Sequence, residues 1–233
     1  MNPTSYSGLA MNDQPAANTV QRIYDALRQR IITLDLPPGT TLSRTELTEE
    51  YGVSQTPLRE ALQKLAHDGL VTIRPQSKTV VSRIDTEQLR EAHFLRVALE
   101  TEVSRRLAEE VPEGTIARLR SIIRMQQAVA DDPSQYRIFQ ELDELFHQTL
   151  FIAAGQPDLH RLVRERAGHM ERVRQLHLPH PGKISDILER HTDIVDRIEA
   201  QDAPGAMEAA RGHLSRTVMQ VEALREKHPD YFT

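Results

Sequence analysis

The segment SRTELTEEYGVSQTPLREALQKL, residues 43–65, decides the fold of the first part of the chain. It opens with Ser43 and has Glu46 three residues later, which is the spacing of a helix capping box. Gly52 stands where a left-handed turn would end this helix, and Ser54 can cap the next one. The segment therefore predicts two helices that are joined by a short turn.

The sequence on either side extends this pattern. Residues 20–39, VQRIYDALRQRIITLDLPPG, have apolar residues at helical spacing and end in a Pro-Pro-Gly stop. Residues 70–84, LVTIRPQSKTVVSRI, alternate on both sides of a short polar turn, which is typical of a two-stranded wing. Helix, helix, turn, helix and hairpin is the order of a winged helix-turn-helix domain, whose third helix enters the major groove of DNA.

The third helix of this domain has a buried stripe and a polar face. The stripe consists of Leu58, Ala61, Leu62 and Leu65. A polar exposed face is common on helices that bind nothing, so this helix alone is equally consistent with an ordinary solvated surface. The order of the elements around it favours DNA binding.

Residues 37–73, PPGTTLSRTELTEEYGVSQTPLREALQKLAHDGLVTI, resemble the N-terminal domain of the GntR superfamily of bacterial transcription regulators. The resemblance covers about residues 20–83. In that superfamily the start of the recognition helix and the tip of the wing contact bases, and neighbouring cations hold phosphates. The resemblance therefore implies that DNA is contacted by Arg44, Thr45, Ser54, Gln55, Thr56, Arg59, Ser77 and Lys78.

Three departures from the superfamily pattern concern DNA contacts. Gln55 stands where Arg is usual, Thr45 replaces a frequent Arg, and Ser77-Lys78 replaces the usual Arg-Gly of the wing tip. Arg pairs with guanine O6 and N7, whereas Gln pairs with adenine N6 and N7. We therefore expect Gln55 to shift the operator preference toward A·T at one base pair. The three cations, Arg44, Arg59 and Lys78, are expected on phosphates, where they set affinity and its salt dependence.

Composition limits the remaining possibilities. The 233 residues include no cysteine, which excludes disulfides and thiolate metal sites and suits a reducing cytoplasm. The net charge is −5, yet residues 20–83 carry +2, so this segment is the candidate for meeting phosphate. Residues 1–19 lack the features of a signal peptide, and we predict a disordered tail there. No apolar run is long enough to cross a bilayer, so no membrane contact is expected.

Residues 84–228 predict a second domain, an all-α bundle of six to seven helices. Residues 85–110, DTEQLREAHFLRVALETEVSRRLAEE, begin with a capping box and place Arg96 within an apolar stripe. The later helices are separated by loops rich in Pro and Gly, and no convincing strand follows residue 85. The chain as a whole is thus predicted to be mainly α.

Polar residues recur at core positions of this bundle. Asp143 and His147 lie one helical turn apart, and His191 and His213 lie on apolar faces of two later helices. A lone His on an apolar face is more often a hydrogen-bonded core residue than a ligand. One carboxylate and three imidazoles together, however, are a sensible ligand set for a divalent ion, with Zn²⁺ or Ni²⁺ the best match.

This half of the chain resembles the FCD effector-binding domain of the FadR-like branch of the same superfamily. The resemblance rests on R-x-x-L-E at residues 96–100, D-x-x-F-H at residues 143–147, and the 22-residue gap between His191 and His213. It implies that Asp143, His147, His191 and His213 bind a metal. It also implies that Arg96 and the metal together hold a small organic acid, although a salt bridge of Arg96 with Glu100 or Asp143 remains the alternative.

The sequence thus predicts a homodimeric DNA-binding regulator and no enzyme. We expect a repressor of carbohydrate or organic-acid catabolism genes that binds an inverted-repeat operator, with a sugar acid or another small organic acid as effector. One alternative is a regulator that senses the metal itself. Another is a metal-dependent enzyme acting on a small carboxylate, although no residue is evident as its general base.

Overall fold

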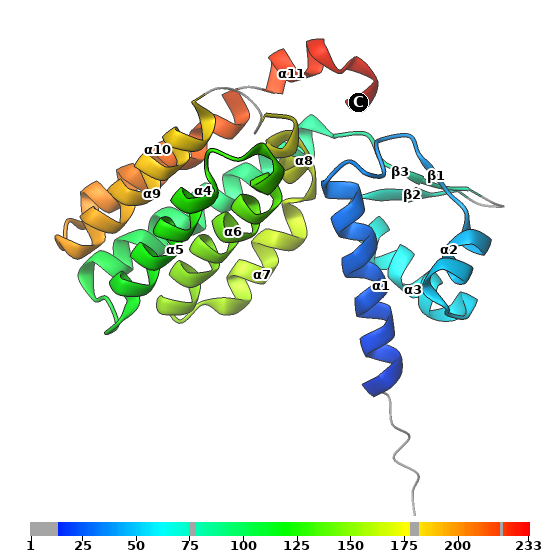
Figure 1. Cartoon of the computed structure of the whole chain (residues 1–233), viewed down its shortest axis with the longest axis horizontal. Coiled ribbons are helices and arrows are strands. Elements are labelled where there is room, and N and C mark those ends of the chain that lie inside the picture. Colours follow the sequence, from blue (N-terminus) through cyan, green and yellow to red (C-terminus); the bar gives the residue numbers. More distant parts are fainter. Residues whose placement is uncertain (1–13, 75–77, 178–181, 220) are drawn as a thin grey trace, which may run out of the picture.

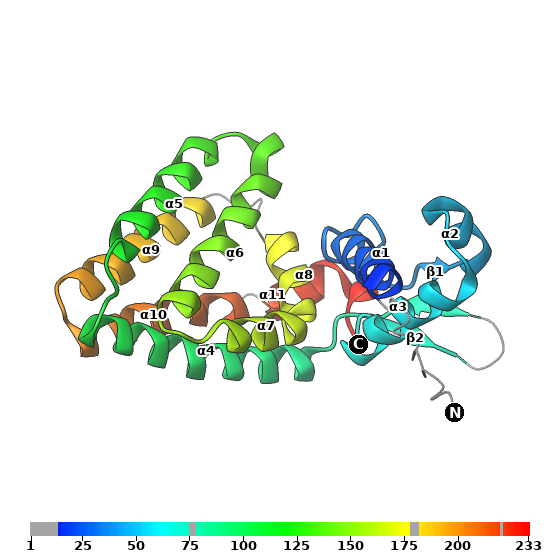
Figure 2. The same cartoon turned by 90° about the horizontal axis from the view of Figure 1, so that it is seen from below.

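The computed structural model describes residues 14–74, 78–177, 182–219 and 221–233. These residues form two parts, an N-terminal winged domain and a C-terminal helical domain, which lie side by side in Figure 1 and Figure 2. The predicted fold class is therefore confirmed. Among the helices of the described residues, none combines the length and the apolar character needed to cross a membrane.

The N-terminal domain has the predicted order of elements. In chain order these are α1 (Gln14–Ile32), β1 (Thr41–Leu42), α2 (Arg44–Tyr51), α3 (Gln55–His67), β2 (Val71–Ile73) and β3 (Thr79–Val81). Ser43 Oγ accepts a hydrogen bond from the N–H of Glu46 at 3.3 Å, as the capping box predicts. Gly52 ends α2 with a φ of 62°, a left-handed conformation that favours glycine. The turn between α2 and α3 is thus built from the residues that predict it.

Two details of this domain differ from the prediction. The wing is a three-stranded sheet of order β1-β3-β2, because β1 pairs with β3 in addition to the predicted hairpin. Helix α1 begins at Gln14, so residues 14–19 are helical and not part of a disordered tail. The two alanines of this stretch favour a helix, and Pro15 lies in the first turn, where it breaks no helical hydrogen bond.

The C-terminal domain is all-helical. Its elements are α4 (Thr86–Glu109), α5 (Thr115–Val129), η1 (Pro133–Gln135), α6 (Tyr136–Ala153), α7 (Pro157–Arg166), α8 (Gly168–His177), α9 (Lys183–Glu199), α10 (Ala203–Met219), α11 (Val221–Lys227) and η2 (Pro229–Tyr231). Within the described residues this makes eight α-helices, against the six to seven expected. A break at Ala167 separates α7 from α8, and the short α11 follows α10.

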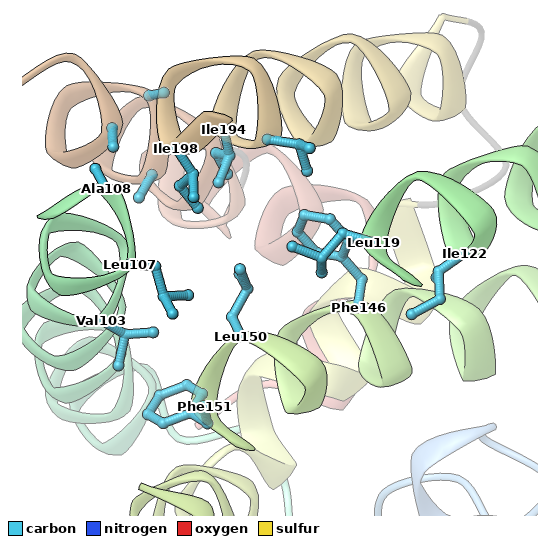
Figure 3. Packing of buried hydrophobic residues seen from close by; sticks show 14 of the residues in the cluster. Val103, Leu107, Ala108, Leu119, Ile122, Phe146, Leu150, Phe151, Ile194 and Ile198 are labelled. Carbon is cyan, nitrogen blue, oxygen red and sulfur yellow. The ribbon is translucent and has the colours of Figure 1, made fainter. Parts of the chain in front are cut away.

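One apolar core holds this bundle together. Leu107 of α4, Leu150 of α6 and Ile198 of α9 are almost completely buried and converge with side chains of α5 and α10, as Figure 3 shows. Burial of a Leu or Ile side chain stabilises a fold by about 1.5–3 kcal/mol. The core therefore fixes α4, α6, α9 and α10 firmly, and these are the helices on which the predicted metal ligands and Arg96 lie.

The two domains are joined by residues 82–85, the interdomain segment. Its backbone is bonded from two sides. Arg172 of α8 donates to the Ser82 carbonyl at 2.6 Å, and the Asp85 N–H donates to Nδ1 of His169 at 2.9 Å. On the other side the N–H of Ile84 donates to the carbonyl of Tyr231 at 2.7 Å. The segment is thus held against both α8 and the C-terminal end of the chain.

Candidate metal and effector site and the DNA interface

The predicted ligands Asp143, His147, His191 and His213 meet inside the helical domain. One ligand atom from each lies within 4.8 Å of the corresponding atom of every other residue. Nε2 of His213 is 3.3 Å from Nε2 of His147, and Nε2 of His191 is 3.5 Å from Oδ1 of Asp143. Asp143 and His147 are on α6, His191 is on α9 and His213 is on α10. The four residues form what we call the ligand cluster.

Two residues outside the cluster orient its imidazoles. Nδ1 of His147 lies 2.7 Å from Oε2 of Glu100, and Nδ1 of His191 lies 3.0 Å from Oε1 of Gln126. Both contacts occupy Nδ1 and leave Nε2 facing the centre of the cluster, which is how metal-binding histidines are usually held. Sequence reasoning missed the role of Gln126. The feature that could have indicated this role is the position of the Gln126 amide on the apolar stripe of α5, which includes Leu119, Ile122 and Ile123.

The charges of the cluster suit a cation. Burial alone would raise the pKa of Asp143, but Arg174 and the surrounding imidazoles hold it well below its ordinary value. Burial lowers the pKa of His191 to about 3 and also lowers that of His213. An ionised carboxylate and neutral imidazoles are the protonation states that bind a metal.

Two buried atoms that face the centre of the ligand cluster lack hydrogen-bond partners among the described residues. They are Oδ1 of Asp143 and Nε2 of His191. Buried polar atoms without partners are uncommon in native proteins, and each needs an explanation such as an ion or a water. Because both atoms face the centre of the ligand cluster, the residues fit a divalent metal.

Two arginines flank the cluster, and both are paired. Arg96 forms an ion pair with Glu100, which is the alternative that the sequence left open. Arg174 of α8 forms an ion pair with Oδ2 of Asp143. The guanidinium that contacts the acidic ligand Asp143 is therefore that of Arg174. The guanidinium of Arg96 contacts Glu100 instead.

Two cavities of very different size lie beside these arginines. A void of about 10 Å³, lined by Arg96, His147 and Arg174 among others, has room for one water at most. A larger cavity of about 200 Å³ is also lined by Arg174, and Arg28 of α1 contributes to its wall. An organic acid would fit the larger cavity, whereas the smaller void would have to expand to admit one.

The residues predicted to contact DNA lie on the surface of the winged domain. The side chains of Thr45, Ser54, Gln55, Thr56, Arg59 and Lys78 are exposed, and that of Arg44 is half-buried. Ser54 occupies the N-cap position of α3 but makes no capping hydrogen bond with its side chain. Ser77 lies outside the described residues. The side chains at the start of α3 are thus exposed and can face a DNA groove.

Comparison with known proteins agrees with both halves of this description. Residues 19–81 match the model of the bacterial regulatory proteins of the gntR family, and residues 91–216 match the model of the FCD domain. The chain belongs to the GntR family. Like other members of this family, it is a DNA-binding transcription regulator, here with an FCD domain at its C-terminal side.

Individual GntR-family relatives cover nearly the whole chain. The transcriptional repressor RspR of Escherichia coli (strain K12) is 32% identical over 94% of this chain and 96% of its own length. A helix-turn-helix transcriptional regulator from an unstable DNA locus of Streptomyces ambofaciens is 35% identical over 90% of this chain and 88% of its own length. The solved structure of E. coli McbR/YncC shares the fold, with a TM-score of 0.71, 20% identity, and coverage of 90% and 98% of the two chains.

Proposed function

We propose that this GntR-family protein is a repressor whose affinity for its operator is set by a small organic acid bound beside a divalent metal. The observation that carries the proposal is the ligand cluster, in which one carboxylate and three imidazoles from three helices meet within 4.8 Å beside an arginine. The repressor RspR, similar over nearly its whole length, supports the sign of the regulation.

Each residue of the site has a part in this function. Asp143, His147, His191 and His213 would hold Zn²⁺ or Ni²⁺, and the bound ion would supply positive charge for a carboxylate. Arg174 and Arg96 would add guanidinium donors, whose planar geometry suits the same group. A sugar acid or a hydroxy acid, with a carboxylate next to hydroxyl groups, is the class of effector that this donor set favours.

The winged domain would translate effector binding into a change at the DNA. We expect a homodimer that binds an inverted repeat, because two symmetric recognition helices require two symmetric half-sites. An effector that favours a dimer with mismatched helices lowers operator affinity by the difference in its own affinity for the two forms. Such coupling is typically about 1–3 kcal/mol, or about 5- to 150-fold in affinity.

A second candidate function is a regulator that senses the metal itself. The close approach of the ligand atoms and the small void beside Arg96 favour this alternative, because an ion needs less room than an acid. A metal-dependent enzyme is a weaker alternative, since the chain is similar to transcription regulators over both domains.

One titration separates these functions. DNA duplexes that the full-length protein selects from a random library are bound first, and Zn²⁺ or Ni²⁺ is then added, followed by a panel of sugar acids, hydroxy acids and dicarboxylates. Release of the DNA by one acid in the presence of metal supports the proposal. Release by metal alone supports the sensor, and turnover of an acid supports the enzyme. If neither metal nor any acid changes DNA binding, the proposal is wrong.

A further inference from the structure

Helix α8 contacts three separate parts of the molecule through neighbouring side chains. Arg174 forms an ion pair with Asp143 of the ligand cluster, and Arg172 donates a hydrogen bond to the interdomain segment. Glu171 pairs with Arg28 of α1, which belongs to the winged domain. In Figure 1 and Figure 2 this helix lies between the bundle and α1. A ten-residue helix thus joins the candidate effector site to both the linker and the first helix of the DNA-binding domain.

The contact of Arg172 is unusual for a buried arginine. Its side chain is completely buried, and within the described residues no carboxylate pairs with it. Nη1 donates to the Ser82 carbonyl at 2.6 Å and Nη2 lies 2.9 Å from Nδ1 of His169. A buried charge without these partners would be costly, so any shift of α8 must carry the Ser82 backbone along or break the contact.

The contact with α1 is also largely buried. The Arg28 side chain is 6% exposed and that of Glu171 is 16% exposed, and their atoms are 2.8 Å apart. Nη2 of Arg28 also donates to the Arg164 carbonyl at 2.9 Å, near the end of α7. Separating this pair would leave Arg28 short of a partner in a buried place, so the position of α1 depends on that of α8.

The ligand cluster can act on α8 in two ways. A cation bound by Asp143 would compete with Arg174 for the same carboxylate, and it would repel the guanidinium. An acid placed between Arg96 and the cluster would need far more than the 10 Å³ available, and Ala167, Glu171 and Arg174 form part of the wall of that void. The helices of the core are close-packed, so the space must come from displacement of an element such as α8.

We propose that α8 is the coupling element of this regulator. Arg174 senses the occupancy of the ligand cluster, and Arg172 and the Arg28–Glu171 pair pass the displacement to the interdomain segment and to α1. Arg172 and Arg28 are positioning residues, and they bind neither metal nor DNA in this scheme. The inference rests on the proposed function, because it takes the ligand cluster as the place where the signal is received.

The test compares full-length Arg172→Met and Arg28→Met with the unmodified protein and with Arg166→Met, which removes an exposed arginine at the end of α7. Zn²⁺ alone is the probe. Its affinity is measured by competition with a chromophoric chelator. Amide hydrogen exchange of residues 82–85 and of α1 reports the coupling without DNA. Arg28→Met keeps the test available if Arg172→Met does not fold.

We expect Zn²⁺ to change amide exchange at residues 82–85 and in α1, both in the unmodified protein and in Arg166→Met. In Arg172→Met and Arg28→Met, Zn²⁺ should bind within about threefold of the normal affinity. Exchange changes should then stop at α8. Variants that retain the full response overturn the inference.

Different results would contradict the coupling through α8 and the proposed function. If the unmodified protein binds Zn²⁺ and exchange beyond α8 does not respond, coupling through α8 is wrong and the metal site stands. If the unmodified protein binds neither Zn²⁺ nor Ni²⁺, the proposed function itself is wrong, and the coupling inference falls with it.

Discussion

Oε1 of Gln126 lies 3.0 Å from Nδ1 of His191, and both side chains are completely buried. The two residues are 65 positions apart in the chain and come from α5 and α9. For His191 to offer Nε2 to a metal, Nδ1 must carry the proton, and Gln126 accepts it. The amide therefore selects the tautomer that the ligand cluster needs.

Replacing Gln126 with Leu should weaken metal binding without removing a ligand. We expect the affinity for Zn²⁺ to fall about 10- to 100-fold, the usual cost of losing a partner of a metal-binding histidine. Competition with a chromophoric chelator measures it. Gln127→Leu, which changes the exposed neighbouring residue, is the control and should bind normally. Unchanged affinity in Gln126→Leu would mean that the amide does not orient His191.

Removing His191 should greatly reduce metal binding. We expect His191→Ala to contain far less metal than the unmodified protein after the same purification, because a four-residue set loses one of its ligands. Elemental analysis gives the metal content of each. His67→Ala, which changes an exposed histidine of α3, should keep the metal. Equal metal content in His191→Ala and the unmodified protein would contradict the metal site.

Gln55 allows a test of DNA sequence choice. We expect Gln55→Arg to change the preferred base pair from A·T to G·C at one position of each half-site, a discrimination of about 1–3 kcal/mol. Selection of sites from a random duplex library measures the preference. Gln63→Arg adds the same charge two turns along α3 and should raise affinity and salt dependence without changing the preferred site. If Gln55→Arg selects the same bases at every position, Gln55 does not read DNA in this way.

His169 makes stability depend on pH. Burial and the nearby Arg172 lower its pKa to about 4, so the folded protein keeps it neutral while the unfolded chain protonates it near pH 6.5. The unfolded state then binds more protons, and stability is lost as the pH falls from 6.5 toward 4. Between pH 6.5 and 4.5 this one group should cost about 2 kcal/mol of unfolding free energy.

Denaturant unfolding at the two pH values, with a chelator present, measures this loss. Because His191 and His213 also have lowered pKa values, the informative quantity is the difference between the unmodified protein and His169→Gln. The variant should lose about 2 kcal/mol less over the interval. An equal loss in both proteins would show that His169 is not kept neutral by the fold.

The sequence predicted those features that depend on spacing along one helix or turn. Asp143 and His147 share a face because they are four residues apart, and Gly52 ends α2 because its backbone is left-handed. The contacts of Arg172 with Ser82 and of Arg174 with Asp143 join residues 90 and 31 positions apart. Helical periodicity places a residue on a face but does not say which face of another helix it meets.

The bonded interdomain segment has a consequence for how the regulator can move. Ile84 is hydrogen-bonded to Tyr231 and Thr233, and Ser82 and Asp85 are hydrogen-bonded to side chains of α8. The winged domain is therefore not joined to the bundle by a flexible linker. The winged domain can pivot about this rigid segment, and a small rotation there gives a larger displacement at the more distant recognition helix α3. Operator release would then need only a small rotation of the winged domain, with no need for the domain to detach.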